Sequence, residues 1–464
     1  MNTTLLLLLA YSAGLIFLGL WIGRRVETSG AFFVAGRRLG PVLIFATVLA
    51  ANIGAGSTVN AAGLGYRDGL SAWWWVGSAG IGTLLLAFWI GPRIWRIAKE
   101  RGLYTVGDFL EVRYGPSVRA VIAVLLWLGT LAILAGQLIA MAWVLDVVAG
   151  VPKVAGCLIG GGVMIVYFAA GGLLTSAWVN LVELVVLLVG FGIALPWVLS
   201  DVGGWSAFAT TVSAPSQDYF GFWKGGGSGW VYLALLAPAF VISPGLLQKV
   251  FGARDERAIR VGVGLAGAVL LVFAFIPPML GMLARAYAPE LANPELALPT
   301  VLMAGLPVAL GSLGLAAVFS AEISSADAIL FMLSTSLSED LYRRFLRRDA
   351  SDAEILRVAR IAAVVGGGLG VALAIVLPTV VGALTIFYTL LGVSLFVPVI
   401  AGLHSRRPGV PEALAAIAGG VTVVAVLRLT GASATGFWNA STLGLLASAV
   451  LFGGVFVARR IWRP

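Results

Sequence analysis

The segment Ala-Glu-Ile-Ser-Ser-Ala-Asp, residues 321–327, places two acids and two hydroxyls inside an otherwise apolar run. An acid near the centre of a bilayer costs roughly 2.5–3.5 kcal/mol on insertion scales, so such residues usually face a cavity, a partner or an ion path. Residues three and four apart share a helix face, so Ala321, Ser324 and Ser325 form one stripe, which Asp327 extends. Hydroxyl and carbonyl oxygens suit a hard cation such as Na⁺. The alternative is that each Ser bonds to a carbonyl of its own helix.

A second polar interruption, Asn-Ile-Gly-Ala-Gly-Ser at residues 52–57, lies in another apolar run. Each Gly costs a helix about 1 kcal/mol relative to Ala, so we expect a discontinuous helix here. Such a break would expose the carbonyls of Ala50 and Ile53, which suit a cation, and free N–H groups near Ser57, which suit an anion. The alternative is close packing of helices through small residues.

The composition indicates a polytopic helical membrane protein. Of the 464 residues, 60% are hydrophobic and 11% are charged, and the mean hydropathy is +1.01. A spanning helix needs about 20 mainly apolar residues. Thirteen spans are predicted, at 4–22, 41–66, 71–91, 119–147, 154–171, 176–199, 229–250, 261–284, 308–340, 357–377, 380–403, 410–429 and 440–458. The range 308–340 is too long for a hydrocarbon core of ~30 Å, so we expect it to project into water.

The basic residues predict the orientation. With the N-terminus outside, nearly all Lys and Arg fall in inner loops, which explains the net charge of +9 without a nucleic-acid partner. Arg24 and Arg25 follow the first apolar run, the reverse of a secretory signal, so the first span is expected to stay. A single Cys157 excludes an internal disulfide, and a single His404 leaves no His/Cys metal cluster. We expect a multi-pass protein of the plasma membrane, in bacteria the inner membrane, with a cytoplasmic C-terminus.

Two blocks of five spans follow each other, at residues 41–199 and 229–403. Because five is odd, the second block enters from the opposite side, and such inverted repeats are typical of secondary transporters. The remaining parts are residues 1–40 with the first helix and a cytoplasmic loop, the external loop 200–228, and residues 404–464 with two C-terminal helices.

The first helix of the second block is also interrupted, at Pro238 and at Ser-Pro-Gly, residues 243–245. Interruptions at corresponding positions of two repeats are the best sequence pointer to a transporter binding site. By position, we expect the solute pocket to be lined by Gly56, Ser57, Asn60, Trp74, Gln137, Phe240, Ser243, Tyr388 and Thr389. Packing for the aromatic residues, and hydrogen bonds between helices for the others, are the alternatives.

Several motifs together resemble the sodium:solute symporter family. They are Ala-Ala-Asn-Ile at 50–53, Ala-x-x-Ser-Ser-Ala-Asp at 321–327, Phe-Phe-Val-Ala-Gly-Arg-Arg at 32–38, Gly-Gly-Leu at 171–173, Gln248-Lys249, and Ser-Glu-Asp-Leu-Tyr at 338–342. The resemblance covers nearly the whole chain. It implies an all-α, leucine-transporter-like core of five plus five helices, with one extra N-terminal and two extra C-terminal helices.

The resemblance also implies a Na⁺ site. The ligands would be the carbonyls of Ala50, Ile53 and Ala321 and the hydroxyls of Ser324 and Ser325, and all five positions match. Na⁺ would be the transported coupling ion, with no organic cofactor. The expected partners are the solute, Na⁺ and the lipid bilayer, with no nucleic acid and no obligate protein partner.

The sequence departs from the family pattern at four acidic or amide positions. Where members often have Thr-Asp followed by Gln, this chain has Asn180 and Glu183, so the acid has moved by one helical turn. Asp327 and Ala328 replace hydroxyls that hold a second Na⁺ in some members, which argues against that second site. Glu322 replaces a small or apolar residue. Glu322 is either a protonatable coupling group or a partner of a neighbour such as Asn180. The candidate residues of an ion path are Asp327, Glu322, Asn180 and Glu183.

The expected function is Na⁺-coupled symport of a small organic solute by alternating access. A polyol is disfavoured, because sugar carriers have several amides and a Tyr where this chain has residues 239–242, Ala-Phe-Val-Ile. A small carboxylate or zwitterion, held by the N–H groups near Ser57, is favoured. The alternative is an H⁺-coupled or Na⁺-independent carrier of a small neutral solute.

Other classes of protein lack their sequence signatures here. An ion channel would need a repeated filter motif or a pore ring, and a membrane-embedded enzyme would need a nucleophile or a metal set. The sequence shows neither the channel signature nor the enzyme signature. We therefore expect neither a channel nor an enzyme. A transport-like sensor would need a signalling domain, and no loop is long enough to hold one.

Overall fold

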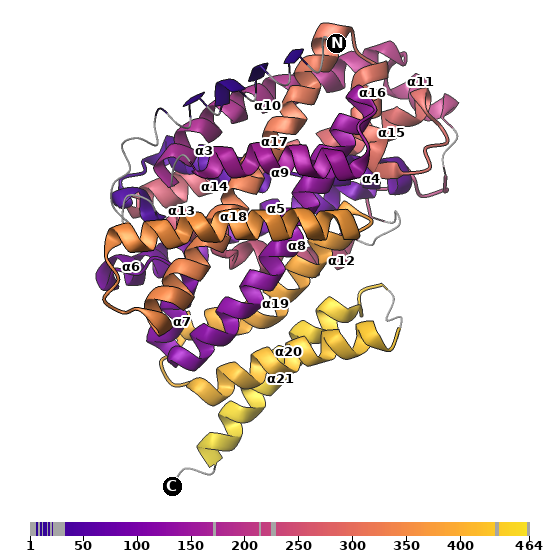
Figure 1. Ribbon diagram of the computed structural model, residues 1–464. Coiled ribbons are helices and arrows are strands. Elements are labelled where there is room, and N and C mark those ends of the chain that lie inside the picture. The colour runs from indigo at the N-terminus through magenta and orange to yellow at the C-terminus, as the bar shows by residue number, and fades with distance from the viewer. Residues whose placement is uncertain are drawn as a thin grey trace.

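The computed structural model describes residues 6–7, 10–11, 13–15, 17–18, 21, 33–169, 173–212, 215–223, 229–431 and 436–461. Within these ranges the chain is helical (Figure 1), apart from one isolated β-bridge between Leu39 and Ala253. Ten helical stretches of the described chain are long and apolar enough to cross a membrane. The all-α membrane class is confirmed. Nine of the 19 residues of the predicted first span, 4–22, and the first two residues of the Gly-Gly-Leu motif lie outside the described residues.

The first block begins with a helix in two pieces. Its elements are α3 (Pro41–Asn52), α4 (Val59–Asp68), η2 (Gly69–Ala72), α5 (Trp73–Leu85), η3 (Leu86–Ile90), α6 (Gly91–Arg101), α7 (Val106–Tyr114), α8 (Pro116–Ala149), α9 (Lys153–Ala169) and α10 (Leu173–Asp201). A short η1 (Ala35–Arg37) precedes them, and α11 (Gly204–Thr211) follows.

The second block has the same plan. Its elements are α12 (Gly229–Val241), α13 (Pro244–Phe251), α14 (Glu256–Phe273), α15 (Ile276–Tyr287), η4 (Pro294–Leu296), α16 (Ala297–Ala304), α17 (Val308–Thr335), η5 (Ser336–Leu346), α18 (Asp352–Val376) and α19 (Val380–His404). The last two helices, α20 (Val410–Leu429) and α21 (Ala440–Ile461), pack on each other at the edge of the bundle (Figure 1).

Both predicted helix interruptions are confirmed. Ile53, which caps α3, has an extended backbone with φ −105° and ψ 99°, and helical structure resumes at Val59. In the second block α12 ends at Val241 and α13 begins at Pro244. Proline has no N–H and disfavours the α conformation of the residue before it, so the break falls at this position.

The count of thirteen spans is not confirmed. The pieces 41–52 and 153–165 fall below the length of a complete span, while residues 59–101 form one continuous helical stretch. The predicted span 261–284 is divided into α14 and α15 just before Pro277 and Pro278. The short helices α7, α11 and α16 were not predicted, because windows of membrane length do not detect them. The expected projection beyond α17 is present and ends at Leu346.

Helix α17 occupies the centre of the bundle, where it packs against α8, α10, α13 and α18. Every residue from 314 to 335 is buried. The polar residues of 321–327 therefore face other helices instead of lipid, as expected for a membrane helix that carries acids.

Candidate ion and solute site

Five oxygen atoms from two helices lie together at the end of α3. The Ser325 hydroxyl lies 3.1 Å from the carbonyl oxygen of Ile53 and 3.3 Å from that of Ala50. The Ser324 hydroxyl lies 3.3 Å from the carbonyl oxygen of Ala50 and 3.0 Å from that of Ala321. We call these five atoms the oxygen cluster. The structure thus brings together all five residues that the sequence nominated as cation ligands.

The break in the helix makes two of these carbonyls available. In a continuous helix, the carbonyl of Ala50 would accept from the N–H of Gly54, and that of Ile53 from the N–H of Ser57. Here the N–H of Gly54 donates to the Ser57 hydroxyl at 3.0 Å, and the N–H of Ser57 donates to the Gly54 carbonyl at 2.9 Å. The carbonyls at the end of α3 therefore keep their lone pairs for another ligand.

Four N–H groups near Ser57 are occupied, although the sequence predicted free N–H groups there. Besides the two just described, the N–H of Thr58 donates to the Gly54 carbonyl at 3.0 Å. The N–H of Ala55 donates to Oε1 of Gln137 at 2.8 Å. These four donors, of Gly54, Ala55, Ser57 and Thr58, are therefore not available to an anion.

A cavity of about 70 Å³ adjoins the oxygen cluster. Ser325 contributes both to the cluster and to the cavity wall. Six of the residues predicted for the solute pocket line it, namely Gly56, Ser57, Gln137, Phe240, Ser243 and Tyr388. The wall also includes Trp75, Ile133, Leu236, Leu246, Ile329, Met332 and Phe387.

Three predicted pocket residues lie elsewhere. The indole N–H of Trp74 donates to the carbonyl of Phe222 at 2.9 Å, and Trp75 takes its place in the cavity wall. The Thr389 hydroxyl contacts a hydroxyl of α21 at 2.7 Å. The Asn60 amide donates to the carbonyl of Gly56, in the unwound segment, at 3.5 Å. Neighbouring residues of a helix point about 100° apart, so an error of one position moves a side chain off the cavity.

The predicted ion-path residues Asn180, Glu183 and Asp327 form a buried polar group. The Asn180 amide lies 3.2 Å from the Thr47 hydroxyl, and its other orientation donates to Oε2 of Glu183 at 3.1 Å. Asp327 lies near Glu183 and near Lys249, whose side chain is only 1% exposed. Sequence reasoning assigned Lys249 to the end of a span and missed this contact. The sequence feature that could have indicated this proximity is the position of Gln248-Lys249 after the second helix break.

Glu322 contacts the outer half of the broken helix. The Thr58 hydroxyl donates to its Oε1 at 2.7 Å, and its Oε2 has no hydrogen-bond partner among the described residues. The side chain is completely buried. Its partner is therefore Thr58, and the predicted pairing with Asn180 is wrong.

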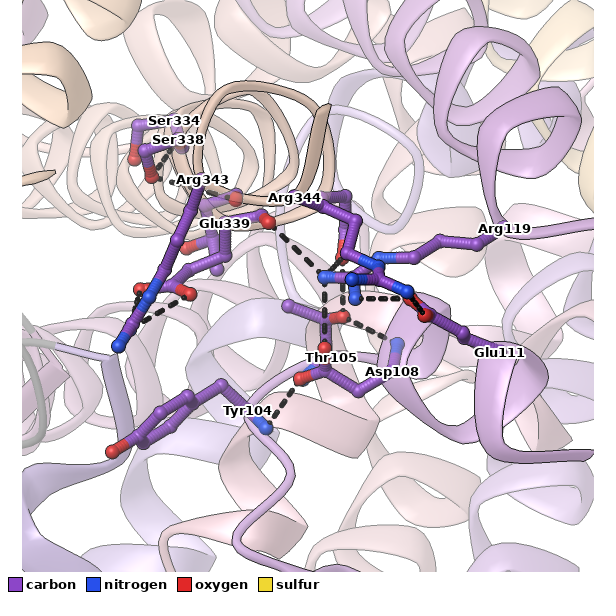
Figure 2. Close-up of polar contacts among 12 residues, drawn as sticks. Tyr104, Thr105, Asp108, Glu111, Arg119, Ser334, Ser338, Glu339, Arg343 and Arg344 are labelled. Carbon is purple, nitrogen blue, oxygen red and sulfur yellow. Dashed lines mark hydrogen bonds and ion pairs between the residues drawn. The ribbon is translucent and has the colours of Figure 1, made fainter. Parts of the chain in front are cut away.

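A cluster of ion pairs lies where α7, α8 and η5 meet (Figure 2). The Arg119 guanidinium, 7% exposed, lies 2.7–2.8 Å from carboxylate oxygens of Asp108, Glu111 and Asp340. Arg344 also pairs with Glu111. Burial raises the pKa of Glu111, but hydrogen bonds and charges from the two arginines outweigh it, so its pKa lies below the ordinary value. This Arg119 cluster ties α7 to the end of α17.

Comparison with known proteins gives one consistent family. The model of the sodium:solute symporter family matches residues 32–420. The chain is 27% identical to the sodium/pantothenate symporter of Escherichia coli, over 89% of this chain and 88% of that protein. It is 24% identical to the sodium/glucose cotransporter of Vibrio parahaemolyticus (76% and 71%) and 26% identical to the human high affinity choline transporter 1 (90% and 74%).

Solved structures show the same fold. A Na⁺-coupled sialic acid symporter in a substrate-bound outward-open state superposes with a TM-score of 0.81 at 18% identity, covering 99% of this chain and 98% of that one. The transporter Mhp1 in a closed conformation gives 0.61 at 14% identity, covering 94% and 95%. The fold is the leucine-transporter-like inverted repeat that the sequence predicts.

Proposed function

The chain belongs to the sodium:solute symporter family, and from this premise we propose that it is a secondary active transporter. It couples the movement of Na⁺ to that of a small organic solute, a small carboxylate or zwitterion, by alternating access. With the N-terminus outside, the Arg119 cluster lies on the cytoplasmic side. Family and fold are those of transporters, and no catalytic role is proposed.

The oxygen cluster is the observation that carries this proposal. Its two hydroxyls each lie within hydrogen-bond distance of two of its three carbonyls. These five uncharged oxygens are a ligand set suited to a hard monovalent cation. Each hydroxyl now donates to a carbonyl. A bound Na⁺ would accept the lone pairs of both groups, with the hydroxyl hydrogens turned away. Since the ligands come from α3 and α17, the ion would join the broken helix to the central helix.

The coupling follows from that position. Ser325 both belongs to the cluster and lines the cavity, so the ion orders one wall of the solute site before the solute binds. One charge that crosses the membrane contributes about 2.3 kcal/mol per 100 mV, and the Na⁺ gradient adds to this. This energy is available to concentrate the solute.

An inner path runs from the cavity toward the Arg119 cluster. Met332 lines the central cavity and also a smaller cavity next to it. The smaller cavity is lined by Thr105, Val106, Gly107, Leu126, Thr130, Pro244, Gln248, Met332, Ser336 and Asp340. Its far wall, Asp340, is a member of the Arg119 cluster. We propose that release to the cytoplasm requires α13 to move away from α17 along this path.

The test compares hydroxyls that differ only in position. In the purified full chain, Ser324→Ala combined with Ser325→Ala should abolish stabilisation by Na⁺ in a thermal-shift assay, and Na⁺-stimulated uptake in proteoliposomes. Ser334→Ala is the matched control, because Ser334 is equally buried in α17 but its hydroxyl bonds to the carbonyl of Phe331. Undiminished stabilisation by Na⁺ in the double variant would contradict the proposal.

A further inference from the structure

The polar groups that the protein leaves unpaired in the cavity include two that can only donate. Gln137 uses its amide oxygen to accept from the N–H of Ala55 at 2.8 Å, which fixes the orientation of the amide. Its Nε2 has no hydrogen-bond partner among the described residues. An amide nitrogen carries two hydrogens and no acceptor. Gln137 therefore offers donors alone to a solute.

Trp75 offers a second donor. The indole N–H groups of its neighbours donate to backbone carbonyls, that of Trp73 to Leu271 at 3.2 Å and that of Trp74 to Phe222 at 2.9 Å. The N–H of Trp75 has no such partner in the described part of the chain, and the residue lines the cavity. An indole nitrogen can only donate.

Both side chains lie against the unwound segment of the broken helix. A Cβ added to Gly56 would lie 3.5 Å from Nε1 of Trp75. A Cβ added to Gly54 would clash with the hydroxyl of Ser325 and lie 2.7 Å from Oε1 of Gln137. Glycine at these two positions lets the Trp75 indole N–H and the Gln137 amide oxygen approach the backbone. Gln137 and Ser325 consequently meet at Gly54, beside the oxygen cluster.

The remaining wall of the cavity is uncharged and mainly apolar. Its apolar part includes Leu236, Phe240, Leu246, Ile329, Met332 and Phe387, and its polar part Asn52, Ser57, Ser243 and Tyr388. None of the described residues that line it is Asp, Glu, Lys or Arg. An anion in this cavity would lack a protein countercharge. A Na⁺ ion in the oxygen cluster supplies one, because Ser325 is shared by the two sites. The attraction between the two charges is stronger here than in water, since the surroundings have a low dielectric constant.

We propose that the solute is a short-chain monocarboxylate. Its carboxylate accepts hydrogen bonds from Nε1 of Trp75 and Nε2 of Gln137 next to the bound Na⁺, and its apolar end lies against Phe240, Ile329 and Met332. This assignment rests on the proposed Na⁺ symport and adds the class of solute to it. It assigns the carboxylate to side-chain donors, because four of the N–H groups near Ser57 are already hydrogen-bonded. Na⁺ then binds before the solute, because its charge stabilises the carboxylate.

A thermal-shift series on the purified full chain tests the solute class, with propionate, propionamide, propylamine and alanine as probes. Propionate should stabilise the protein in Na⁺ medium and not in K⁺ medium, because the carboxylate needs the neighbouring ion. Propionamide has a similar shape without the charge and should have little effect. Equal stabilisation by propionamide or propylamine would overturn the proposal, and so would stronger stabilisation by alanine than by propionate.

Two variants test the donors. Trp75→Phe keeps an aromatic ring and removes the N–H, so the propionate concentration for half-maximal stabilisation should rise roughly tenfold or more, as expected for a hydrogen bond to a charged group. Trp74→Phe is the matched control, because that N–H is directed at Phe222, and it should leave the value unchanged. Gln137→Glu keeps an acceptor for Ala55 but faces the carboxylate with a like charge, and should abolish stabilisation by propionate. Wild-type affinity in Trp75→Phe and Gln137→Glu would overturn the proposal.

Stabilisation by Na⁺ alone separates the two proposals. If Na⁺ without solute stabilises the wild type and Trp75→Phe, the ion site stands whatever propionate does. If no carboxylate then acts, only the solute assignment fails. If Na⁺ has no effect on the wild type, the proposed symport itself fails.

Discussion

The Ser325 hydroxyl of α17 lies 3.1 Å from the carbonyl oxygen of Ile53, the residue at which α3 ends. The two residues are 272 positions apart in the chain. Neither group would be available in continuous, lipid-facing helices, because the carbonyl would bond within its helix and the hydroxyl would turn back to its own backbone. The contact thus joins the two inverted repeats at their centre.

Gly54→Ala should weaken Na⁺ binding. The added Cβ would collide with the Ser325 side chain and approach Oε1 of Gln137 to 2.7 Å, so the oxygen cluster must shift. The Na⁺ concentration for half-maximal thermal stabilisation should rise at least severalfold. Gly162→Ala is the control, because nothing lies within 4 Å of a Cβ at that position in α9. An unchanged Na⁺ response in Gly54→Ala would mean that Ser325 is not needed in its present place.

Arg119→Met should strongly destabilise the protein. The side chain is 7% exposed and pairs with three carboxylates. Without it the buried Asp340 loses its countercharge, whereas Glu111 keeps its pair with Arg344. Breaking such a site typically costs about 3–5 kcal/mol in the free energy of unfolding. Arg254→Met removes an exposed pair with Asp255 and should cost at most about 1 kcal/mol. Denaturant unfolding in detergent measures both.

The Arg119 cluster also allows a non-additivity test. Adding Asp340→Asn to Arg119→Met removes one uncompensated charge, so the double variant should be more stable than the sum of the single effects predicts. Strict additivity would argue that Arg119 and Asp340 do not interact in the folded protein.

The stability of the protein should depend on Glu111 in acid. Its folded-state pKa lies below the ordinary value of 4.5, so the ionised form is favoured by folding. Its stabilising contribution is complete above the unfolded pKa and is lost as the pH falls through the folded value. Glu111→Gln should therefore lower the melting temperature at about pH 7, and the difference from wild type should shrink as the pH approaches about 3. A difference that grows in acid would contradict this sign.

Thr58→Val should destabilise the broken helix, whereas Thr58→Ser should not. The Thr58 hydroxyl donates to Oε1 of Glu322, whose other oxygen has no partner in the described chain. Loss of the hydroxyl leaves a buried carboxyl group with less compensation, at a cost of about 1–3 kcal/mol in unfolding free energy. Serine keeps the hydroxyl. Equal stability of the two variants would mean that Glu322 finds another partner.

Much of the fold could be predicted because its signals are local. Apolar runs of membrane length and the prolines and glycines of the two broken helices act within a few residues of chain. The short helices α7 and α16 were missed for the same reason, since they are too short for a hydropathy window. The division of α14 from α15 depends on Pro277 and Pro278 inside an otherwise apolar run.

The candidate site was only partly predictable. The Ser pair and the break at Ile53 are sequence patterns, and the structure places their oxygens together. Trp75 in place of Trp74, and Thr389 turned toward α21, differ from the prediction by the direction in which a helical residue points. That direction depends on how each helix is rotated against its neighbours.

By itself, the sequence determined the membrane class, the two interrupted helices and the chemistry of the oxygen ligands, because these follow from hydropathy, backbone preference and residue type. Only the tertiary structure decided that four N–H groups near Ser57 are occupied, that Glu322 contacts Thr58, and that Lys249 lies near Asp327. A buried polar group must find its partner across the packed helices, and that choice depends on distances in space between residues far apart in the chain.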